Sequence, residues 1–492
     1  MNTNDGLARL EAQIVRDLER IDHPAMPWLE PRIAPDGTEA LDVLIVGGGQ
    51  SGVAIGFGLL RAKVDNILVI DGAARGQEGP WRSFARMGTL RSPKDYTGPD
   101  LDIPSLTYRS WHEAKFGTDD WDALGLIPRE YWADYLLWVR DVTGVPVRNG
   151  VRMTGVFAAG PGLLAVEVEE NGHRSVLHTR KLVLATGQDG LGRWWMPECL
   201  ERLPARLRAH AADRIDFAAL AGKTVAVIGL GASALDNAAS ALEAGAASVH
   251  VFCRRRDPQL IQSYRWLTFA GFLRHLGDLD DAWRWRFMSQ VLGRREGFPQ
   301  PTWDRCARWP NFSLHTGSPI ESARPSDDGV ELTIAGNPVQ VDFIIAGTGM
   351  DIDPAHRPEL AAIAPHIAAW SDRYTPPAEF RDDRLGRYPY LAPDYSLTER
   401  VPGTAPELAD IHVFSIASTM SFGPSGSSIN AMTSAVPKLV NGLTRSLFQA
   451  DLDRHWTSFC AYDVPQAVLT PTSRLPGPPA VPSRRDGQIQ HQ

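Results

Sequence analysis

The sequence predicts an α/β protein with two Rossmann-like dinucleotide-binding domains, the first split in sequence and the second inserted into it. An antiparallel β meander and a helical, aromatic-rich insertion complete the predicted fold. Two observations carry this prediction. An apolar run leads into a glycine-rich turn at residues 43–52, and a second run does the same at 223–234. Each turn precedes a helical pattern and a further apolar run, which is the order of a βαβ unit.

The first turn has the G-x-G-x-x-G spacing, in Gly47, Gly49 and Gly52. The first glycine makes the turn, the second lets backbone approach a pyrophosphate, and the third lets helix and strand pack closely. The next strand, 66–70, ends on Asp71, a carboxylate placed to accept hydrogen bonds from a ribose. The alternative is a βαβ unit with an incidental glycine turn. A membrane span here is excluded by the glycine content.

The second turn carries Gly229 and Gly231, with Ala234 in place of the third glycine. The strand after its helix is followed by Arg254, Arg255 and Arg256. Positive charge at that position suits a 2′-phosphate, so we expect NADPH on the second unit and FAD on the first. The alternative for the three arginines is a solvated basic turn.

Net charge, the N-terminal sequence and cysteine spacing limit the kinds of partner and cellular location that we expect. A net charge of −8 over 492 residues gives no reason to expect nucleic acid or an anionic membrane as partner. The N-terminus lacks the apolar segment of a signal peptide, and no stable membrane insertion is expected. The four cysteines are far apart and form no C-x-x-C, which argues against a metal site, a disulfide framework and a disulfide reductase. A reducing cytoplasm fits best, and a homo-oligomer is possible.

The remaining elements follow from periodicity and from glycine and proline positions. We expect helices at 7–21 and 127–140, and between them a functional loop at 72–102. Strands are expected at 151–156, 163–168 and 173–178 for the meander, and at 181–185, 341–346 and 412–416 for buried positions. The predicted domains begin with a helical extension at 1–40. The FAD-binding domain follows at 41–205 and 336–450, and the NADPH-binding domain lies between its parts at 206–335, with a helical insertion at 257–312. A partly disordered tail at 451–492 ends the chain, with disorder expected beyond about residue 465.

The order of these motifs resembles the class B flavoprotein monooxygenases, which include N-hydroxylating, Baeyer–Villiger and flavin-containing monooxygenases. The resemblance rests on the two glycine turns, on Thr186 and Gly187 after a strand, on His210, and on residues 342–349. Residues 127–138 are similar to a segment of the ornithine and lysine N-hydroxylases. Two features depart from these groups: His210 lacks the Phe and Gly of the Baeyer–Villiger fingerprint, and Gln50 stands where N-hydroxylases usually have proline.

The resemblance implies an NADPH- and FAD-dependent monooxygenase that acts on a small organic substrate and O2 through a C4a-(hydro)peroxyflavin. A urate hydroxylase-like activity is compatible with the motif order. A flavin reductase or dehydrogenase without oxygenation, and a catalytically silent flavin-bound interaction protein, stay open.

Candidate site residues follow from these motifs. The polar residues expected nearest the flavin and nicotinamide are Arg91, Lys94, Asp95 and His210. Those expected to bind the cofactors are Gly47, Gly49, Gln50, Ser51, Gly52, Asp71, Trp81, Arg82, Thr186, Gly187, Gly229, Gly231, Ala232, Ser233, Arg254, Arg255, Arg256, Thr348, Gly349, Ser427 and Ser428. Aromatic residues of the insertion either cover an apolar cavity or pack in the core.

Overall fold

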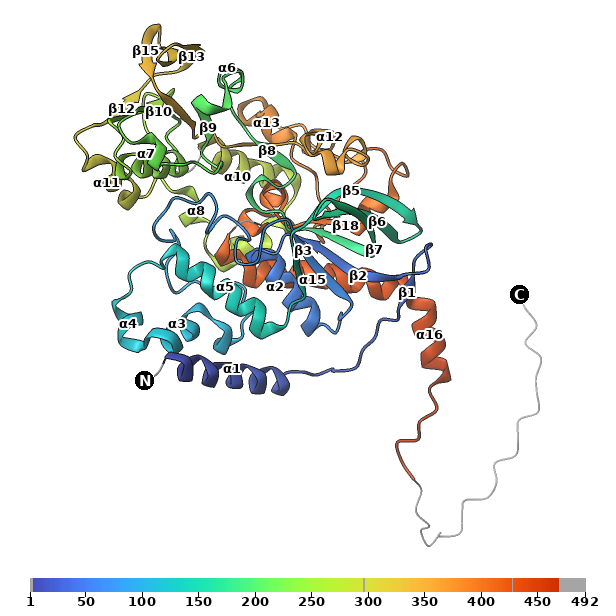
Figure 1. Cartoon of the computed structure of the whole chain (residues 1–492). Helices are drawn as coiled ribbons and strands as arrows, with labels where there is room; N and C mark the ends of the chain where they lie inside the picture. Colours follow the sequence, from blue (N-terminus) through green and yellow to red (C-terminus); the bar gives the residue numbers. More distant parts are fainter. Residues whose placement is uncertain (1–2, 295–296, 427, 469–492) are drawn as a thin grey trace, which may run out of the picture. The chain divides into compact units, whose positions relative to one another are not determined.

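The computed structural model describes residues 3–294, 297–426 and 428–468. The described residues up to 450 form one compact unit, and the described residues from 451 onward form a separate C-terminal segment. The compact unit contains two larger sheets, one with parallel and antiparallel strands and one with parallel strands only (Figure 1). One of the two glycine turns belongs to each sheet. Within the described ranges, no helix is long and apolar enough to cross a membrane.

The larger sheet carries the first glycine turn. Its parallel strands run in the order β4, β3, β2, β7, β18, with bounds Val147–Asn149, Ile67–Asp71, Glu39–Val46, His173–Leu184 and Ile411–Val413. The meander consists of β5 (Val151–Gly160), β6 (Leu163–Glu170) and the first half of β7, and β1 (Arg32–Ile33) pairs with the start of β2. The strands predicted separately at 173–178 and 181–185 are therefore one strand, because β7 leaves the meander and enters the parallel sheet without a turn.

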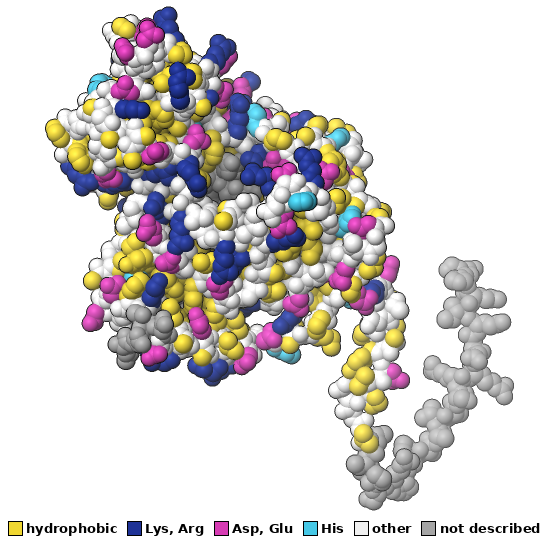
Figure 2. Space-filling model, in the orientation of Figure 1, with side chains coloured by type: hydrophobic (Ala, Val, Ile, Leu, Met, Phe, Trp, Pro, Cys, Tyr) yellow, Lys and Arg dark blue, Asp and Glu magenta, His cyan; other side chains and the backbone are white. Residues whose placement is uncertain are grey.

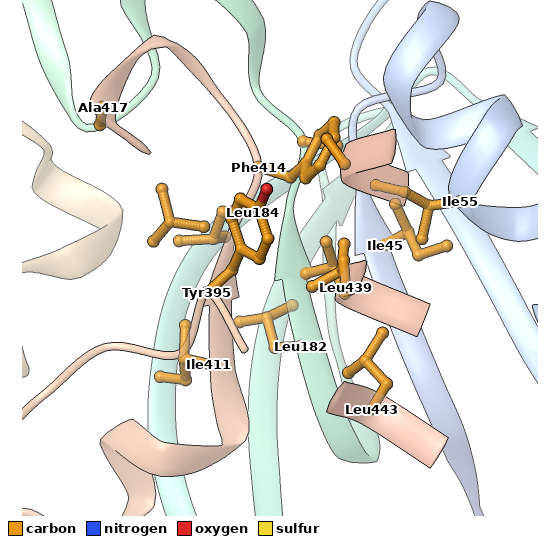
Figure 3. Close-up of a cluster of buried hydrophobic side chains, with 14 of the residues drawn as sticks. Ile45, Ile55, Leu182, Leu184, Tyr395, Ile411, Phe414, Ala417, Leu439 and Leu443 are labelled. Carbon is orange, nitrogen blue, oxygen red and sulfur yellow. The ribbon is translucent and has the colours of Figure 1, made fainter. Parts of the chain in front are cut away.

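Apolar side chains from strands and helices meet beneath this sheet (Figure 3). Ile45 of β2 and Leu182 of β7 face α15 (Met432–Ala450), which contributes Leu439 and Leu443. The helix after the first turn, α2 (Gln50–Arg61), adds Ile55. The remaining helices of this part are α1 (Thr3–Arg20), α3 (Tyr108–Phe116), α4 (Thr118–Ala123), α5 (Arg129–Thr143) and α14 (Thr419–Phe422).

The second parallel sheet has the order β12, β11, β10, β16, β9, with bounds Phe312–Thr316, Ser248–Cys253, Thr224–Ile228, Phe343–Ala346 and Arg208–His210. Its core packs on α7 (Ala232–Glu243) and α11 (Gln300–Ala307). The strand predicted at 341–346 is interrupted at Asp342, whose backbone and carboxylate bond to Thr224. A three-stranded antiparallel sheet not predicted from the sequence adjoins it: β13 (Ile320–Ser326), β14 (Gly329–Ile334) and β15 (Asn337–Val341).

The segments around the two sheets are mostly short helices and turns. The insertion is helical as predicted, with α8 (Ser263–Trp266), α9 (Ala270–His275) and α10 (Asp281–Arg294) before α11. Residues 72–103 form turns with one isolated bridge at Thr89, which confirms the predicted loop. Short elements elsewhere are β8 (Gly192–Trp194), α6 (Glu198–Glu201), β17 (Met350–Ile352), α12 (Trp370–Arg373) and α13 (Asp383–Gly386). The C-terminal segment contains α16 (Leu452–Ala461), which the sequence did not predict. Most of the predicted disorder falls on 469–492, outside the described residues.

Candidate active site

A cavity of about 2530 Å³ joins the two nucleotide motifs. Its lining includes Gly47 and Gly49 from the larger sheet, and Gly229 and Gly231 from the second sheet. Parts of the 72–103 loop and of the helical insertion complete the wall. Both glycine turns follow the carboxyl ends of parallel strands, where α/β proteins bind their ligands.

The three glycines of the first turn meet different structural requirements. Gly47 has φ +111°, and a Cβ there would lie 2.3 Å from the carbonyl oxygen of Ala185. A Cβ on Gly52 would lie 1.8 Å from the carbonyl oxygen of Gly47. A Cβ on Gly49 would have its nearest neighbour, Gly79, at 3.9 Å. Gly47 and Gly52 thus serve the protein's own packing, whereas Gly49 leaves open space in the cavity.

The start of α2 is suited to an anion. Gly49 caps the helix without a side-chain hydrogen bond, and the first turn contains no acidic residue. The backbone bond from Val53 to Gly49 is the first of the helix, so the preceding N–H groups have no helical acceptor. Unpaired N–H groups and the positive end of the helix dipole favour a phosphate here. These features fit the pyrophosphate of FAD.

Asp71 is fixed at the end of β3 on the cavity wall. Its two carboxylate oxygens accept hydrogen bonds from the backbone N–H groups of Gly48 and Ala73, each at 2.7 Å. Burial nevertheless raises the pKa of Asp71, against the opposing effect of these bonds. A carboxylate held in this way keeps lone pairs available for a ribose hydroxyl.

The second turn repeats the first in its backbone geometry. Gly229 has φ +119°, and a Cβ on it would lie 2.3 Å from the carbonyl oxygen of Gly347. Gly231 caps α7 without a side-chain bond, and a Cβ there would meet nothing within 4 Å. The third position, Ala234, packs against Gly347, where a Cβ would lie 2.4 Å from that of Ala234. The second turn therefore also fits a dinucleotide pyrophosphate.

The two nucleotide-binding units differ at the position that Asp71 occupies in the first unit. Gly47 donates to Ile70, and Gly229 donates in the same way to Phe252, so Cys253 occupies the position that Asp71 has in the first unit. The three arginines that follow are not equivalent. Arg254 is exposed and lines the cavity, Arg255 lines it but donates to the carbonyls of Gly293 and Arg294, and Arg256 is not part of the lining. Arg254 is the arginine best placed for a 2′-phosphate.

The other predicted cofactor residues divide into two groups. Those that line the cavity are Gln50, Ser51, Trp81, Thr186, Gly187, Ala232, Ser233, Thr348, Gly349 and Ser428. Trp81 Nε1 and Thr186 Oγ1 are buried without a hydrogen bond in the described part of the chain, as expected of atoms that a ligand would satisfy. Arg82 is not part of the lining and pairs with Asp134 of α5. Ser427 lies outside the described residues.

The residues expected nearest the flavin and nicotinamide divide in the same way. Arg91 and His210 line the cavity, whereas Lys94 and Asp95 do not. Lys94 donates to the carbonyl of Trp121 at 2.6 Å and lies 4.6 Å from the centre of its ring. Lys94 therefore fastens the 72–103 loop to α4.

His210 is buried at the end of β9. Its ring lies 5.2 Å from that of Trp194, and its Nδ1 accepts a hydrogen bond from the N–H of Ala212 at 3.1 Å. Burial lowers the pKa of His210, against the opposing effects of Asp213 and the Gly349 backbone. The imidazole is therefore neutral near pH 7, with its proton on Nε2.

Sequence reasoning missed two groups that line the cavity. One is the aromatic pair Trp194 and Phe84, whose ring centres lie 5.6 Å apart. The other is Asp236 on α7, which is 2% exposed and accepts bonds from arginines of two other segments. The available signal was an acidic residue among the alanines and leucines of a helix pattern, since an acidic residue in a buried position is usually paired.

Comparison with known proteins agrees with this geometry. A family model described as FAD-NAD(P)-binding matches residues 44–189, and one described as L-lysine 6-monooxygenase/L-ornithine 5-monooxygenase matches residues 123–264. The FAD-dependent urate hydroxylase of Xanthomonas campestris pv. campestris is 38% identical over 464 residues, covering 94% of this chain and 97% of that protein.

Solved structures show the same fold at low sequence identity. The ornithine N-hydroxylase of Kutzneria sp. 744 superposes with a TM-score of 0.63 at 16% identity, covering 83% of this chain and 99% of that one. The L-lysine 6-monooxygenase of Pseudomonas syringae gives a TM-score of 0.64 at 20% identity, covering 82% and 99%.

The fold and the site define an FAD- and NAD(P)-binding monooxygenase, an oxidoreductase class, which confirms the predicted fold class and resemblance. Within that class, the chain belongs to the family of FAD-dependent monooxygenases that contains the Xanthomonas urate hydroxylase.

Proposed function

We propose that this enzyme is an NADPH- and FAD-dependent hydroxylase of urate or a closely related oxopurine. The observation that carries the proposal is its similarity to the urate hydroxylase over nearly the full length of both chains. In the proposed reaction NADPH donates two electrons, one atom of O2 enters the purine as a hydroxyl group, and the other leaves as water. Bound FAD supplies the hydride acceptor and the oxygen chemistry.

The charge of the cavity wall supports an anionic substrate. Its arginines are Arg91, Arg254, Arg255, Arg265, Arg305, Arg384 and Arg387. Its acidic residues, among those the structure describes, are Asp71, Asp236, Asp351 and Asp382. This excess of positive charge favours anions, namely both dinucleotides and the urate anion.

The shape of the wall supports a flat substrate. Trp194, Phe84 and His210 lie together on one side of the cavity. Aromatic faces stack well on planar heterocycles. His210 adds its imidazole ring to this wall, and burial lowers its pKa, so the wall gains a further flat face without a second buried charge. We propose that this group positions the purine.

A second candidate reaction, N-hydroxylation of an amino-acid side chain, is favoured by the match of residues 123–264. That substrate presents an ammonium group, which requires a free carboxylate or a comparable acceptor. Asp236, Asp351 and Asp382 each pair with an arginine, and Asp71 holds the first turn. Because these acids are engaged, we place N-hydroxylation second.

The experiment compares substrates in one assay. NADPH oxidation by the FAD-loaded enzyme is followed with urate, xanthine, L-ornithine and L-lysine, and the products formed under isotopically labelled O2 are analysed by mass spectrometry. We expect stimulation by urate and one labelled oxygen atom in the purine product. Stimulation by ornithine or lysine alone would refute the purine proposal, and unlabelled products throughout would favour a reductase.

We also propose a cytoplasmic location, because the four cysteines are free and the two buried ones, Cys253 and Cys306, lie in separate elements. Burial raises the pKa of Cys306 to about 12, which keeps that thiol protonated and unreactive. A homo-oligomer stays a prediction; sedimentation of the purified protein tests it.

A further inference from the structure

A buried carboxylate joins the two halves of the cavity. Asp236 of α7 is 2% exposed. Its Oδ2 accepts a hydrogen bond from Arg91 Nη2 at 2.7 Å, and its Oδ1 accepts from Thr302 at 3.1 Å and from Arg305 at 3.2 Å. Arg91 belongs to the 72–103 loop, whereas Thr302 and Arg305 belong to α11. A buried charge of this kind is stable only while its partners stay in place.

Arg305 is held from several sides. It donates two bonds to Glu243 at the end of α7, at 3.1 and 2.8 Å, and one to the carbonyl of Arg86 at 3.0 Å. Its bond to Asp236 is therefore part of a fixed framework that joins α7, α11 and Arg86 of the 72–103 loop. That framework does not depend on Arg91.

Arg91 is held more loosely. Its side chain is 34% exposed at the cavity, and the bond to Asp236 is its one ion pair in the described part of the chain. Its Nε is buried without a hydrogen bond in the same part of the chain. Arg91 thus lines the cavity while one of its nitrogens is fixed by Asp236. Through this bond the 72–103 loop contacts α7 directly, in addition to the contact of its residue Arg86 with Arg305 of α11.

The position of Asp236 on α7 places its bond to Arg91 near the second glycine turn. The helix begins at Ala232, next to the open space in front of Gly231, and Asp236 lies about one turn further along. A dinucleotide phosphate at the helix start therefore lies close to the segment that Arg91 contacts. The 72–103 loop includes Trp81 and Leu90, which line the flavin side of the same cavity.

We propose that Asp236 is a positioning residue that fixes Arg91 at the boundary of the two nucleotide sites, so that binding of the nicotinamide dinucleotide at α7 also orders the 72–103 loop over the cavity. Asp236 acts through Arg91 and touches no substrate. The inference rests on a nicotinamide dinucleotide at α7 and is independent of which organic substrate is oxidised.

Loss of this link has a defined chemical consequence. An open cavity admits water, and the electrons of NADPH would then be lost to O2 without oxygenation of the substrate. The overall stoichiometry of that leak is NADPH, a proton and O2 giving NADP+ and H2O2. We expect a larger share of the electrons in peroxide, weaker NADP+ binding, and a higher KM for NADPH, with little change in FAD content.

The experiment uses the full-length FAD-loaded protein and NADP+ itself as the probe. Arg91→Gln removes the positive charge that pairs with Asp236 from the loop and leaves Asp236 paired with Arg305. Asp236→Asn removes the negative charge and one of the two acceptor oxygens, and the double variant tests whether the two act together. We expect the Kd for NADP+, measured by calorimetry, to rise about fivefold or more in each single variant, the lower end of coupling between protein sites. NADP+ should slow hydrogen exchange of residues 72–103 in the wild type but not in the variants.

Arg308→Gln is the matched control. Arg308 pairs with Glu243 in the same region, is 58% exposed and is not part of the cavity wall. We expect it to leave the Kd and the exchange pattern unchanged. Wild-type Kd values in Arg91→Gln would overturn the proposal even if Asp236→Asn failed to fold. An equal effect of Arg308→Gln, or strictly additive effects of the two single variants, would also overturn it. None of these outcomes depends on whether urate is the substrate.

Discussion

Replacing Gly49 with valine tests the FAD site with little disturbance to the protein. Gly49 has φ −74° and ψ −169°, a backbone conformation that valine adopts readily. Its added Cβ would have no protein atom nearer than 3.9 Å. The side chain would instead fill the space in front of the α2 N-terminus. We therefore expect the variant to fold and to purify without its flavin.

The size of the effect follows from the bonds that the valine blocks. Loss of two charge-assisted hydrogen bonds between helix N–H groups and a pyrophosphate costs about 3–6 kcal/mol, at about 1.5–3 kcal/mol each. This corresponds to a Kd for FAD that is roughly 10²- to 10⁴-fold higher. Titration of the apoprotein with FAD measures the change, and the thermal midpoint of the apoprotein should stay near that of the wild type.

Two comparisons make the test specific. Gly52→Ala should lower the stability of the apoprotein itself, because its Cβ would lie 1.8 Å from the Gly47 oxygen. Gly231→Val should leave FAD in place and weaken NADP+ binding, since the open space at Gly231 belongs to the second turn. Gly49→Val protein with wild-type FAD content would refute the assignment of the first turn.

Three further outcomes follow from the structure. Arg254→Gln should raise the KM for NADPH and leave the KM for NADH nearly unchanged, as measured by steady-state kinetics. Arg256→Gln should change neither KM, because only Arg254 of the two lines the cavity. Equal use of both cofactors by the wild type would exclude a 2′-phosphate site. Gly347→Ala should cost about 1–3 kcal/mol through overpacking against Ala234. Ala234→Gly in the same chain should restore only part of the thermal midpoint, because the new Cβ would still lie 2.8 Å from the Cα of residue 234; a Gly347→Ala variant as stable as the wild type would contradict that contact. Burial lowers the pKa of His412, so His412 takes up a proton less readily in the folded protein than in the unfolded chain. The free energy of unfolding should therefore decrease as the pH falls below about 6.5. His412→Gln should lessen the drop in thermal midpoint between about pH 7.5 and 5.5, and an unchanged drop would contradict this.

The glycine turns could be predicted because their causes are local. A positive φ at Gly47 and Gly229 and the close approach of the third residue to a strand are demands on a short stretch of sequence. The three arginines after β11 were harder to separate. Arg254 and Arg255 differ only through the segment at 293–294, which lies far along the chain and captures one of them. No local pattern carries that information.

The antiparallel sheet β13–β15 was missed for a related reason. Pro325 lies in β13 and Pro338 in β15, and proline within a run argues against a strand. The sheet tolerates both prolines because β13 and β15 are its edge strands. Asp236 was missed because its partners come from residues 91 and 305, and only the folded chain brings them together.

The sharing of one cavity by both turns depends on the two connections between the sheets. The chain enters the second nucleotide-binding part through β8 and leaves it through β17. These two strands pair antiparallel, with Trp194 opposite Met350. The N–H of Trp195 also donates to the carbonyl of Gly349 at 2.9 Å. Because entry and exit are tied together, the second glycine turn is held toward the first. The same pairing sets Trp194 against His210, so the connection that orients the two nucleotide sites also builds the aromatic wall proposed to hold the substrate.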